Sequence, residues 1–281
     1  MEKNRFIFIS LFYSRDNWTA LNVNFVGPML DEIQLRFHVA APIIHISRDR
    51  GENIGITIPV TETNGLQVAE FIDVQAKSFF HLHPCKRDRK SSRALSFFKD
   101  FPVNSIQYNL HTFPFTAGSD PDNDLMLLPF RVVSRLIREI LLDEDFYEES
   151  PFTFSFYLHL LLIHSLSENM IPAKLLVDKD ASGKPEHKQA FDLNKDTLLE
   201  ITESVLSDEI NLSEDNTWMK DWMHTCSDIL QKDSTHDPLV FYKKVSAGIN
   251  RQLGLNVASA EMLSAFIHYC MEKRKPMVMD K

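Results

Sequence analysis

The sequence predicts an α+β fold, with a ferredoxin-like βαββαβ sheet layer over residues 1–118 followed by a mainly helical part over residues 119–281. Three observations support this prediction. Four short stretches in the first part have the apolar content or the alternation of strands, and two stretches with helical spacing separate them. Beyond residue 125, almost every apolar pattern has helical spacing. We expect the helical part to pack on the sheet as one structural unit.

The chain opens with a strand and a helix. Residues 6–13 form an aromatic and apolar stretch with β-branched residues, which suits a central strand. Residues 19–35 have helical spacing, and Gly27 and Pro28 predict a kink or break in that helix.

A hairpin, a helix and a last strand follow. Residues 41–47 and 54–60 are typical of two hairpin strands, because a polar turn containing Gly51 separates them. Residues 66–80 return to helical spacing, and residues 106–110 alternate between apolar and polar side chains. The order is that of a split βαβ fold, in which two right-handed crossovers place both helices on one face of a four-stranded sheet.

The second part is expected to be a layer of helices. Pro129 suits the first turn of one helix, and residues 152–167 form a buried helix that is too short and too polar to span a membrane. Residues 178–188 are charged and contain glycine and proline, which is typical of a loop. We expect Asn194 and Ser259 to cap two later helices.

Composition narrows the class of protein. The 281 residues carry 30 basic and 39 acidic side chains, and the net charge of −9 argues against a mainly phosphate-driven nucleic-acid binder. The three cysteines lie far apart, which suits a reducing compartment better than a disulfide framework. No secretion signal is evident near the N-terminus, so a cytoplasmic protein is expected.

Two local clusters could bind ions. His81, His83 and Cys85 are zinc-type ligands that would point the same way on an extended segment, but Pro84 spoils regular geometry and no fourth ligand is suggested. We therefore expect no metal here. The basic stretch at residues 86–93 could hold an anion, with a solvated loop as the alternative. No glycine-rich phosphate loop, nucleophile elbow or HExxH motif is present, and no cofactor is expected.

The layout resembles a known family. The stretches FIFISLFY and FVGPMLDEI near the start, IIHISRDRGENIGITI at residues 43–58 and INRQLG at residues 249–254 carry the resemblance, which covers nearly the whole chain. They are similar to the thiopeptide-type bacteriocin biosynthesis family, the glutamate-eliminating C-terminal domain of lantibiotic dehydratases. This chain would be a stand-alone member.

Several family positions differ in this chain. His45 stands at or near a family arginine, and Gly55 and Thr57 replace two strand arginines. The stretch FPFTAGS at residues 113–119 lacks the family's glutamate and arginine, and Ser246 stands where the family has a histidine. Only Asn250 and Arg251 match cleanly.

The resemblance implies a lyase reaction in the maturation of ribosomal peptides, including lantibiotics. A larger dehydratase subunit glutamylates serine or threonine of a precursor peptide. The elimination domain then removes the α-proton and expels glutamate, leaving dehydroalanine or dehydrobutyrine. Such a step needs a base, and cations over the developing charge. The nearest candidates are His45, Arg48, His111 and Arg251. The implied partners are the precursor peptide and the larger dehydratase subunit, and a homodimer stays open.

Three other interpretations stay open. The chain could be a pyridine-forming cyclase on the same scaffold, a non-catalytic peptide-binding partner of a larger dehydratase, or an unrelated α+β binding protein. The enzyme interpretation is slightly favoured because lyase and cyclase members of such families tolerate divergent sites. The sequence alone leaves enzymatic activity undecided.

Overall fold

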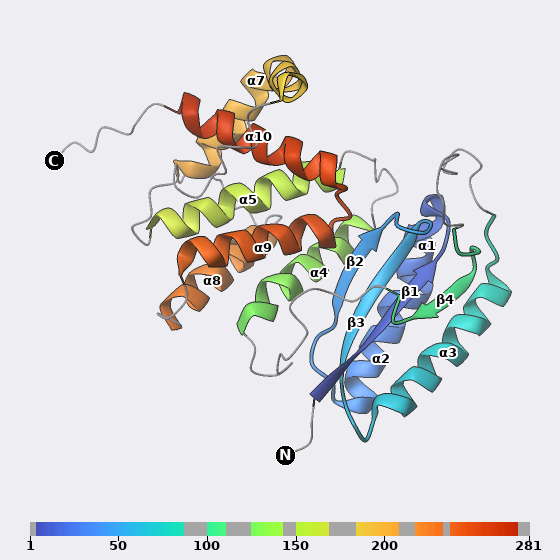
Figure 1. Ribbon diagram of the computed structural model, residues 1–281. Helices are drawn as coiled ribbons and strands as arrows, with labels where there is room; N and C mark the ends of the chain where they lie inside the picture. Colours follow the sequence, from blue (N-terminus) through green and yellow to red (C-terminus); the bar gives the residue numbers. More distant parts are fainter. Residues whose placement is uncertain are drawn as a thin grey trace. The chain divides into compact units, whose positions relative to one another are not determined.

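The computed structural model describes residues 4–86, 100–110, 125–142, 150–168, 184–207, 217–232 and 237–274 (Figure 1). The chain divides into two compact units. The sheet unit comprises Met1–Tyr147 and Arg251–Gly254, and the helical unit comprises Glu148–Asn250 and Leu255–Lys281. The fold is α+β, as the sequence predicts.

The sheet unit is built on four antiparallel strands in the order β2-β3-β1-β4. The strands are β1 (Asn4–Phe12), β2 (Ile43–Ser47), β3 (Asn53–Thr61) and β4 (Ser105–Tyr108). Its α-helices are α1 (Trp18–Leu21), α2 (Gly27–Phe37), α3 (Gly65–Leu82) and α4 (Leu128–Ile140). Its described residues also form the short helical segments η1 (Arg15–Asn17), η2 (Asn22–Val26) and η4 (Leu125–Leu127). The predicted order of strands and helices in the first 110 residues is confirmed.

The two faces of the sheet have different character. On one face the buried side chains of the three longer-paired strands β1, β2 and β3 are aliphatic, and include Ile9, Leu11, Ile44, Ile46, Ile54, Ile56 and Ile58. On the opposite face Phe6, Phe8 and Ile43 pack with residues of η4 and α4. Figure 1 shows α2 and α3 together on one side of the strands, and α4 beside β2.

Because α4 packs on β2, it belongs to the sheet unit. The first segment of the compact sheet unit runs to Tyr147. Leu127 at the end of η4 and Phe130 in the first turn of α4 cover the strands, and both are fully buried. A helical pattern in the sequence does not say which unit a helix joins.

The predicted break at Pro28 takes the form of a wider turn. A five-residue π-helical segment, η2, separates α1 from α2 and ends just before Gly27. Proline lacks an N–H and its ring crowds the carbonyl four residues earlier, so the preceding turn must widen.

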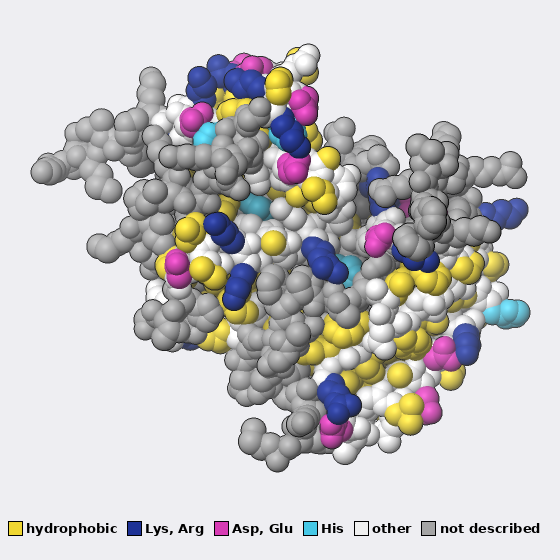
Figure 2. Space-filling model, in the orientation of Figure 1, with side chains coloured by type: hydrophobic (Ala, Val, Ile, Leu, Met, Phe, Trp, Pro, Cys, Tyr) yellow, Lys and Arg dark blue, Asp and Glu magenta, His cyan; other side chains and the backbone are white. Residues whose placement is uncertain are grey.

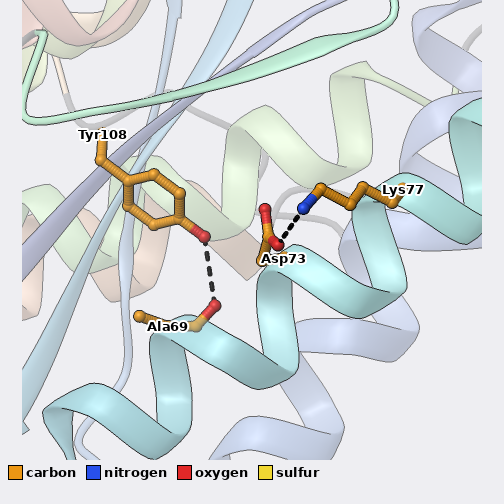
Figure 3. A network of polar contacts seen from close by, with 4 residues as sticks. All are labelled: Ala69, Asp73, Lys77 and Tyr108. Carbon is orange, nitrogen blue, oxygen red and sulfur yellow. Dashed lines mark hydrogen bonds and ion pairs between the residues drawn. The ribbon is translucent and has the colours of Figure 1, made fainter.

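The edge strand β4 is attached to α3 by a tyrosine. Figure 3 shows Tyr108 reaching α3, where its Oη donates a hydrogen bond to the carbonyl of Ala69 at 3.1 Å. One turn further along the helix Asp73 pairs with Lys77. Burial, and then the charge of Asp73, raise the pKa of Tyr108 to about 12, so its hydroxyl remains a donor at neutral pH.

The helical unit contains five of the described helices. They are α5 (Ser150–Glu168), α7 (Pro185–Leu206), α8 (Thr217–Lys232), α9 (Pro238–Gln252, its last two residues in the sheet unit) and α10 (Val257–Lys273). The predicted buried helix is α5, and α8 packs on it through the fully buried Trp222, whose Nε1 donates to the carbonyl of Leu158. Among the described residues, no helix has both the length and the apolar character needed to cross a membrane.

Two of the predicted helix starts are wrong. Asn194 lies in the middle of α7, where its side chain donates to the carbonyl of Ala190, because the helix already begins at Pro185. Of the expected loop at residues 178–188, the part from Pro185 onward is helical, and residues 178–183 lie outside the described residues. The cap of α10 is Asn256, whose side chain accepts from the backbone N–H of Ser259.

Candidate functional site

The imidazole of His45 lies directly over Gly55. The two residues are opposite each other on β2 and β3, and His45 is only 5% exposed. A Cβ built on Gly55 would lie 2.0 Å from Nε2 of His45 and 2.1 Å from its Cε1, far inside contact distance. The histidine ring therefore occupies the space that a side chain at residue 55 would need.

Two hydroxyl groups extend this polar region across the sheet. Ser10 is opposite Gly55 on β1, and Thr57 is the next residue of β3 on the same face. Both residues are 1% exposed, and neither hydroxyl has a hydrogen-bond partner within the described part of the chain. Since burying an unpaired hydroxyl costs about 1–3 kcal/mol, this is an unusual place for serine and threonine. The surface view in Figure 2 shows mainly apolar side chains over the strands.

Residues 251–254 lie against the edge strand that carries His45. The fully buried Gln252 donates from Nε2 to the carbonyls of Ile44 at 2.8 Å and Phe130 at 2.7 Å. The same nitrogen lies 2.9 Å from Oγ of Ser134, which in turn accepts from the backbone N–H of Ile44. Edge strands expose unpaired N–H and C=O groups. Here both groups of Ile44 are satisfied.

The INRQLG stretch ends α9 by a Schellman motif. The N–H of Leu255 bonds to the carbonyl of Asn250, and the N–H of Gly254 bonds to the carbonyl of Arg251. Gly254 has a φ of +70°, and a Cβ there would lie 2.7 Å from the carbonyl oxygen of Ile46. Glycine is required on both grounds, since the backbone is left-handed and it approaches β2 closely.

Of the four predicted site residues, His45 and Arg251 lie in segments that contact each other. His45 is on β2, and the segment that begins with Arg251 contacts β2 at Ile44 and Ile46, the residues on either side of His45. Arg48 is exposed and follows the last residue of β2. Arg251 is exposed. His111 lies outside the described residues.

Asn250 makes its polar contacts within the helical unit. Its Oδ1 accepts from Oγ of Ser155 at 2.7 Å and lies 3.1 Å from Nε2 of His159, both on α5. Because an amide oxygen only accepts, the proton of this imidazole is on Nε2. His159 is 2% exposed, and burial lowers its pKa to about 4 despite its hydrogen bonds. The cluster is therefore electrically neutral at pH 7.

The HLHPC cluster at residues 81–85 does not have the extended form that would point its three ligand-type side chains the same way. His81 lies in the last turn of α3, because the helix runs to Leu82, and it is exposed. The Cys85 thiol accepts from the N–H of Ser14, and burial raises its pKa, so it stays protonated near neutral pH. In the described ranges, no three His, Cys, Asp or Glu side chains are grouped as a metal site would need. Of the basic stretch 86–93, only Lys86 is described.

Sequence reasoning missed the residues that hold this site together. Gln252 and Ser134 carry no recognisable motif by themselves, although Gln252 lies inside the INRQLG stretch. The sequence feature that could have pointed to Ser134 is its position as a polar residue on an otherwise apolar helix face. It does not identify its partner.

Comparison with known proteins gives a fold but no sequence family. No protein-family model and no curated protein sequence matches the chain. Among solved structures, the pyridine synthase TbtD from thiomuracin biosynthesis is similar with a TM-score of 0.66 and 14% identity, over 95% of this chain and 97% of that one. TsrL is similar with a TM-score of 0.57 and 12% identity, over 97% and 95% of the two chains.

A third similar structure is much longer than this chain. The tRNA-dependent lantibiotic dehydratase MibB from Microbispora sp. 107891 gives a TM-score of 0.50 and 10% identity. The similarity covers 95% of this chain but only 28% of MibB. The shared fold therefore occurs both in a protein of this size and as one part of a large dehydratase.

Proposed function

We propose that this chain matures a ribosomally made precursor peptide by elimination chemistry at the edge of β2 where His45 lies. The observation that carries the proposal is the contact of residues 251–254 with Ile44 and Ile46, the two residues that flank His45. Support also comes from fold similarity over nearly the full length to the pyridine synthase TbtD and from the partial match to MibB.

The first candidate reaction is removal of glutamate from glutamylated serine or threonine. A base takes the α-proton, the Cα–Cβ double bond forms, and the Cβ–O ester bond breaks as glutamate leaves as a carboxylate. In this proposal the imidazole of His45 is the base, and Arg251 and Arg48 stabilise the developing enolate and the leaving carboxylate. Arginine suits the second task because its planar fork can hold a carboxylate with two hydrogen bonds.

A specific observation favours a second candidate, a pyridine-forming cyclase. This chain matches TbtD over nearly the whole length of both proteins, whereas it matches only a fraction of MibB. A cyclase would act on a peptide that already contains dehydroamino acids, so the two candidates differ in substrate. Both require removal and return of protons beside peptide carbonyls.

The direct test supplies purified protein with two peptides. If the chain is an elimination enzyme, a glutamylated precursor loses its glutamyl group and free glutamate appears, both followed by mass spectrometry. If it is a cyclase, only the dehydroalanine-containing peptide changes, and the product gains the ultraviolet absorbance of a pyridine. A chain that binds the peptide but changes neither substrate would be a non-catalytic partner, and the catalytic proposal would be wrong.

Site variants test the assigned roles. His45→Ala should lower kcat by about 10²–10⁴-fold, the usual contribution of a general base. His81→Ala is the matched control, because it removes an exposed histidine outside the site. Arg251→Lys keeps the charge and loses the fork, so it should be clearly slower than wild type and faster than Arg251→Met. Equal rates for these two arginine variants would contradict the role of Arg251.

Two partners are proposed with this function, the precursor peptide and a larger dehydratase subunit that performs the glutamylation. Mixing the chain with such a subunit should shift its elution volume in size-exclusion chromatography. We also propose that the sheet layer is ferredoxin-like, which the antiparallel order β2-β3-β1-β4 supports.

A further inference from the structure

We infer that Gln252 is a positioning residue for the proposed site, because its buried amide fixes the Arg251 segment to the edge of the strand that carries His45. The inference rests on the proposed function for its kinetic consequence. Its structural part, that one amide sets the geometry of this edge, stands on contacts within the sheet unit alone.

The amide joins residues 251–254 to two elements of the sheet unit, β2 and α4. Its two N–H groups reach the carbonyl of Ile44 on β2 and the carbonyl of Phe130 in the first turn of α4. Ser134 completes the junction, since its Oγ donates to Phe130 and accepts from the N–H of Ile44. All of these groups are buried, so water cannot replace the amide.

Glutamine is well suited to this position. A glutamate of the same length would bring a carboxylate against two carbonyl oxygens and could donate to neither while ionised. A methionine would fill the same space but leave both carbonyls of Ile44 and Phe130 without that donor. Only a neutral side chain with two donors on one atom satisfies both.

The position of Gln252 makes its effect specific to the site. The neighbouring Arg251 is the exposed cation of the proposal, and Gly254 lies against the carbonyl of Ile46 two residues later. The contacts at Ile44 and Ile46 bracket His45, whose ring has its own fixed place over Gly55. Loss of the hydrogen bonds of Gln252 should therefore let the Arg251 segment move, while His45 keeps its position.

A matched pair of variants separates positioning from stability. Gln252→Met removes a buried amide that donates to a carbonyl of α4. Asn22→Leu does the same elsewhere, since Nδ2 of the buried Asn22 donates to the carbonyl of Arg138 near the end of α4. We expect the two variants to unfold at similar temperatures. Only Gln252→Met should lower kcat, by about ten- to hundredfold, the scale of a misplacement of about 1 Å, while KM for the peptide stays unchanged.

A measurement without substrate tests the same idea independently. Backbone hydrogen exchange of residues 253–255 should be at least about tenfold faster in Gln252→Met than in Asn22→Leu or wild type, because a local anchor is lost. Ser134→Ala, which spares both carbonyl bonds of Gln252, should have a smaller effect in the same direction. It also provides the test if Gln252→Met fails to fold.

The outcomes distinguish the two proposals. If wild-type protein leaves both peptides unchanged but exchange rises as expected, the proposed function is wrong and the anchoring by Gln252 is correct. If wild type is active and Gln252→Met matches Asn22→Leu in kcat and in exchange, Gln252 is merely structural and the inference is overturned.

Discussion

Two residues of one helical turn, Asn250 and Gln252, enter buried polar clusters of different kinds. In the sheet unit, Gln252 donates to backbone carbonyls and so ties a strand edge to a helix. In the helical unit, Asn250 accepts from two side chains of α5, one of which is a titratable histidine. The first cluster consists of amide, hydroxyl and carbonyl groups, so a change in pH does not alter it. The second is stable only while His159 remains neutral.

The largest expected effect is steric and lies in the sheet unit. Gly254→Ala would force a left-handed residue and place a Cβ 2.7 Å from the carbonyl of Ile46. We expect a loss of about 4 kcal/mol in unfolding free energy from backbone strain and overpacking together. The control is Gly65→Ala, whose Cβ would meet Val60 at an ordinary 3.4 Å. Urea unfolding with equal midpoints for both variants would contradict the close approach.

The next effect tests the coupling between His45 and Gly55. Gly55→Ala puts a Cβ where the imidazole lies, and we expect a cost of about 3 kcal/mol. A flexible ring can yield more easily than a backbone, so the cost should be smaller than at Gly254. Combining it with His45→Ala should recover much of the loss. Strict additivity in a double-mutant cycle would count against the packing of the ring over the glycine.

The stability of the helical unit should depend on pH in a way that the stability of the sheet unit does not. An unfolded histidine has a pKa of 6.5, and in the folded chain burial lowers the pKa of His159 to about 4. Between these values the unfolded chain binds a proton that the folded chain excludes, so stability falls as pH falls. The loss between pH 7 and pH 5 should be about 2 kcal/mol.

His159→Gln serves as the control for that titration, because it keeps a donor near Asn250 and cannot titrate. Hydrogen exchange at pH 7 and pH 5 would show which unit loosens. An unchanged pH dependence in His159→Gln would mean that another group is responsible. A pH-dependent loss confined to the sheet unit would contradict the contrast between the two clusters.

The smallest expected effect lies at the other edge of the sheet. Tyr108→Phe removes the hydrogen bond to Ala69 and keeps the aromatic ring. Because Tyr108 is 37% exposed, water can replace the lost partner, and we expect a cost of about 0.5–1 kcal/mol. Thermal unfolding measures it. A loss as large as that of Gly254→Ala would mean that the β4 edge constrains the sheet as strongly as the β2 edge does.

Local sequence patterns predicted the first part of the chain well. Strand alternation at residues 106–110, the glycine turn of the hairpin and the proline break in the first helix all have direct local causes, and each is present. Capping rules were less reliable. Asn194 has the chemistry of a cap, but the helix already starts at Pro185, where proline fits the first turn.

The candidate site could be predicted only in part. His45 and Arg251 were named from their resemblance to family positions, and the tertiary structure brings the Arg251 segment to the strand of His45. No pattern in the sequence indicated that Gly55 makes room for the ring, because that contact depends on strand register across a hairpin. Gln252 was missed because its partners lie more than one hundred residues away in sequence.

The α+β class, the four strands and the helical character of the second part could all be predicted from the sequence, since they follow from apolar periodicity and from the positions of glycine and proline. Two features became evident only in three dimensions: α4 joins the sheet unit, and residues 251–254 lie against the edge of β2. The same is true of the neighbouring residues of one motif, which enter different clusters. Packing between distant segments sets these features, and local periodicity carries no information about which segments meet.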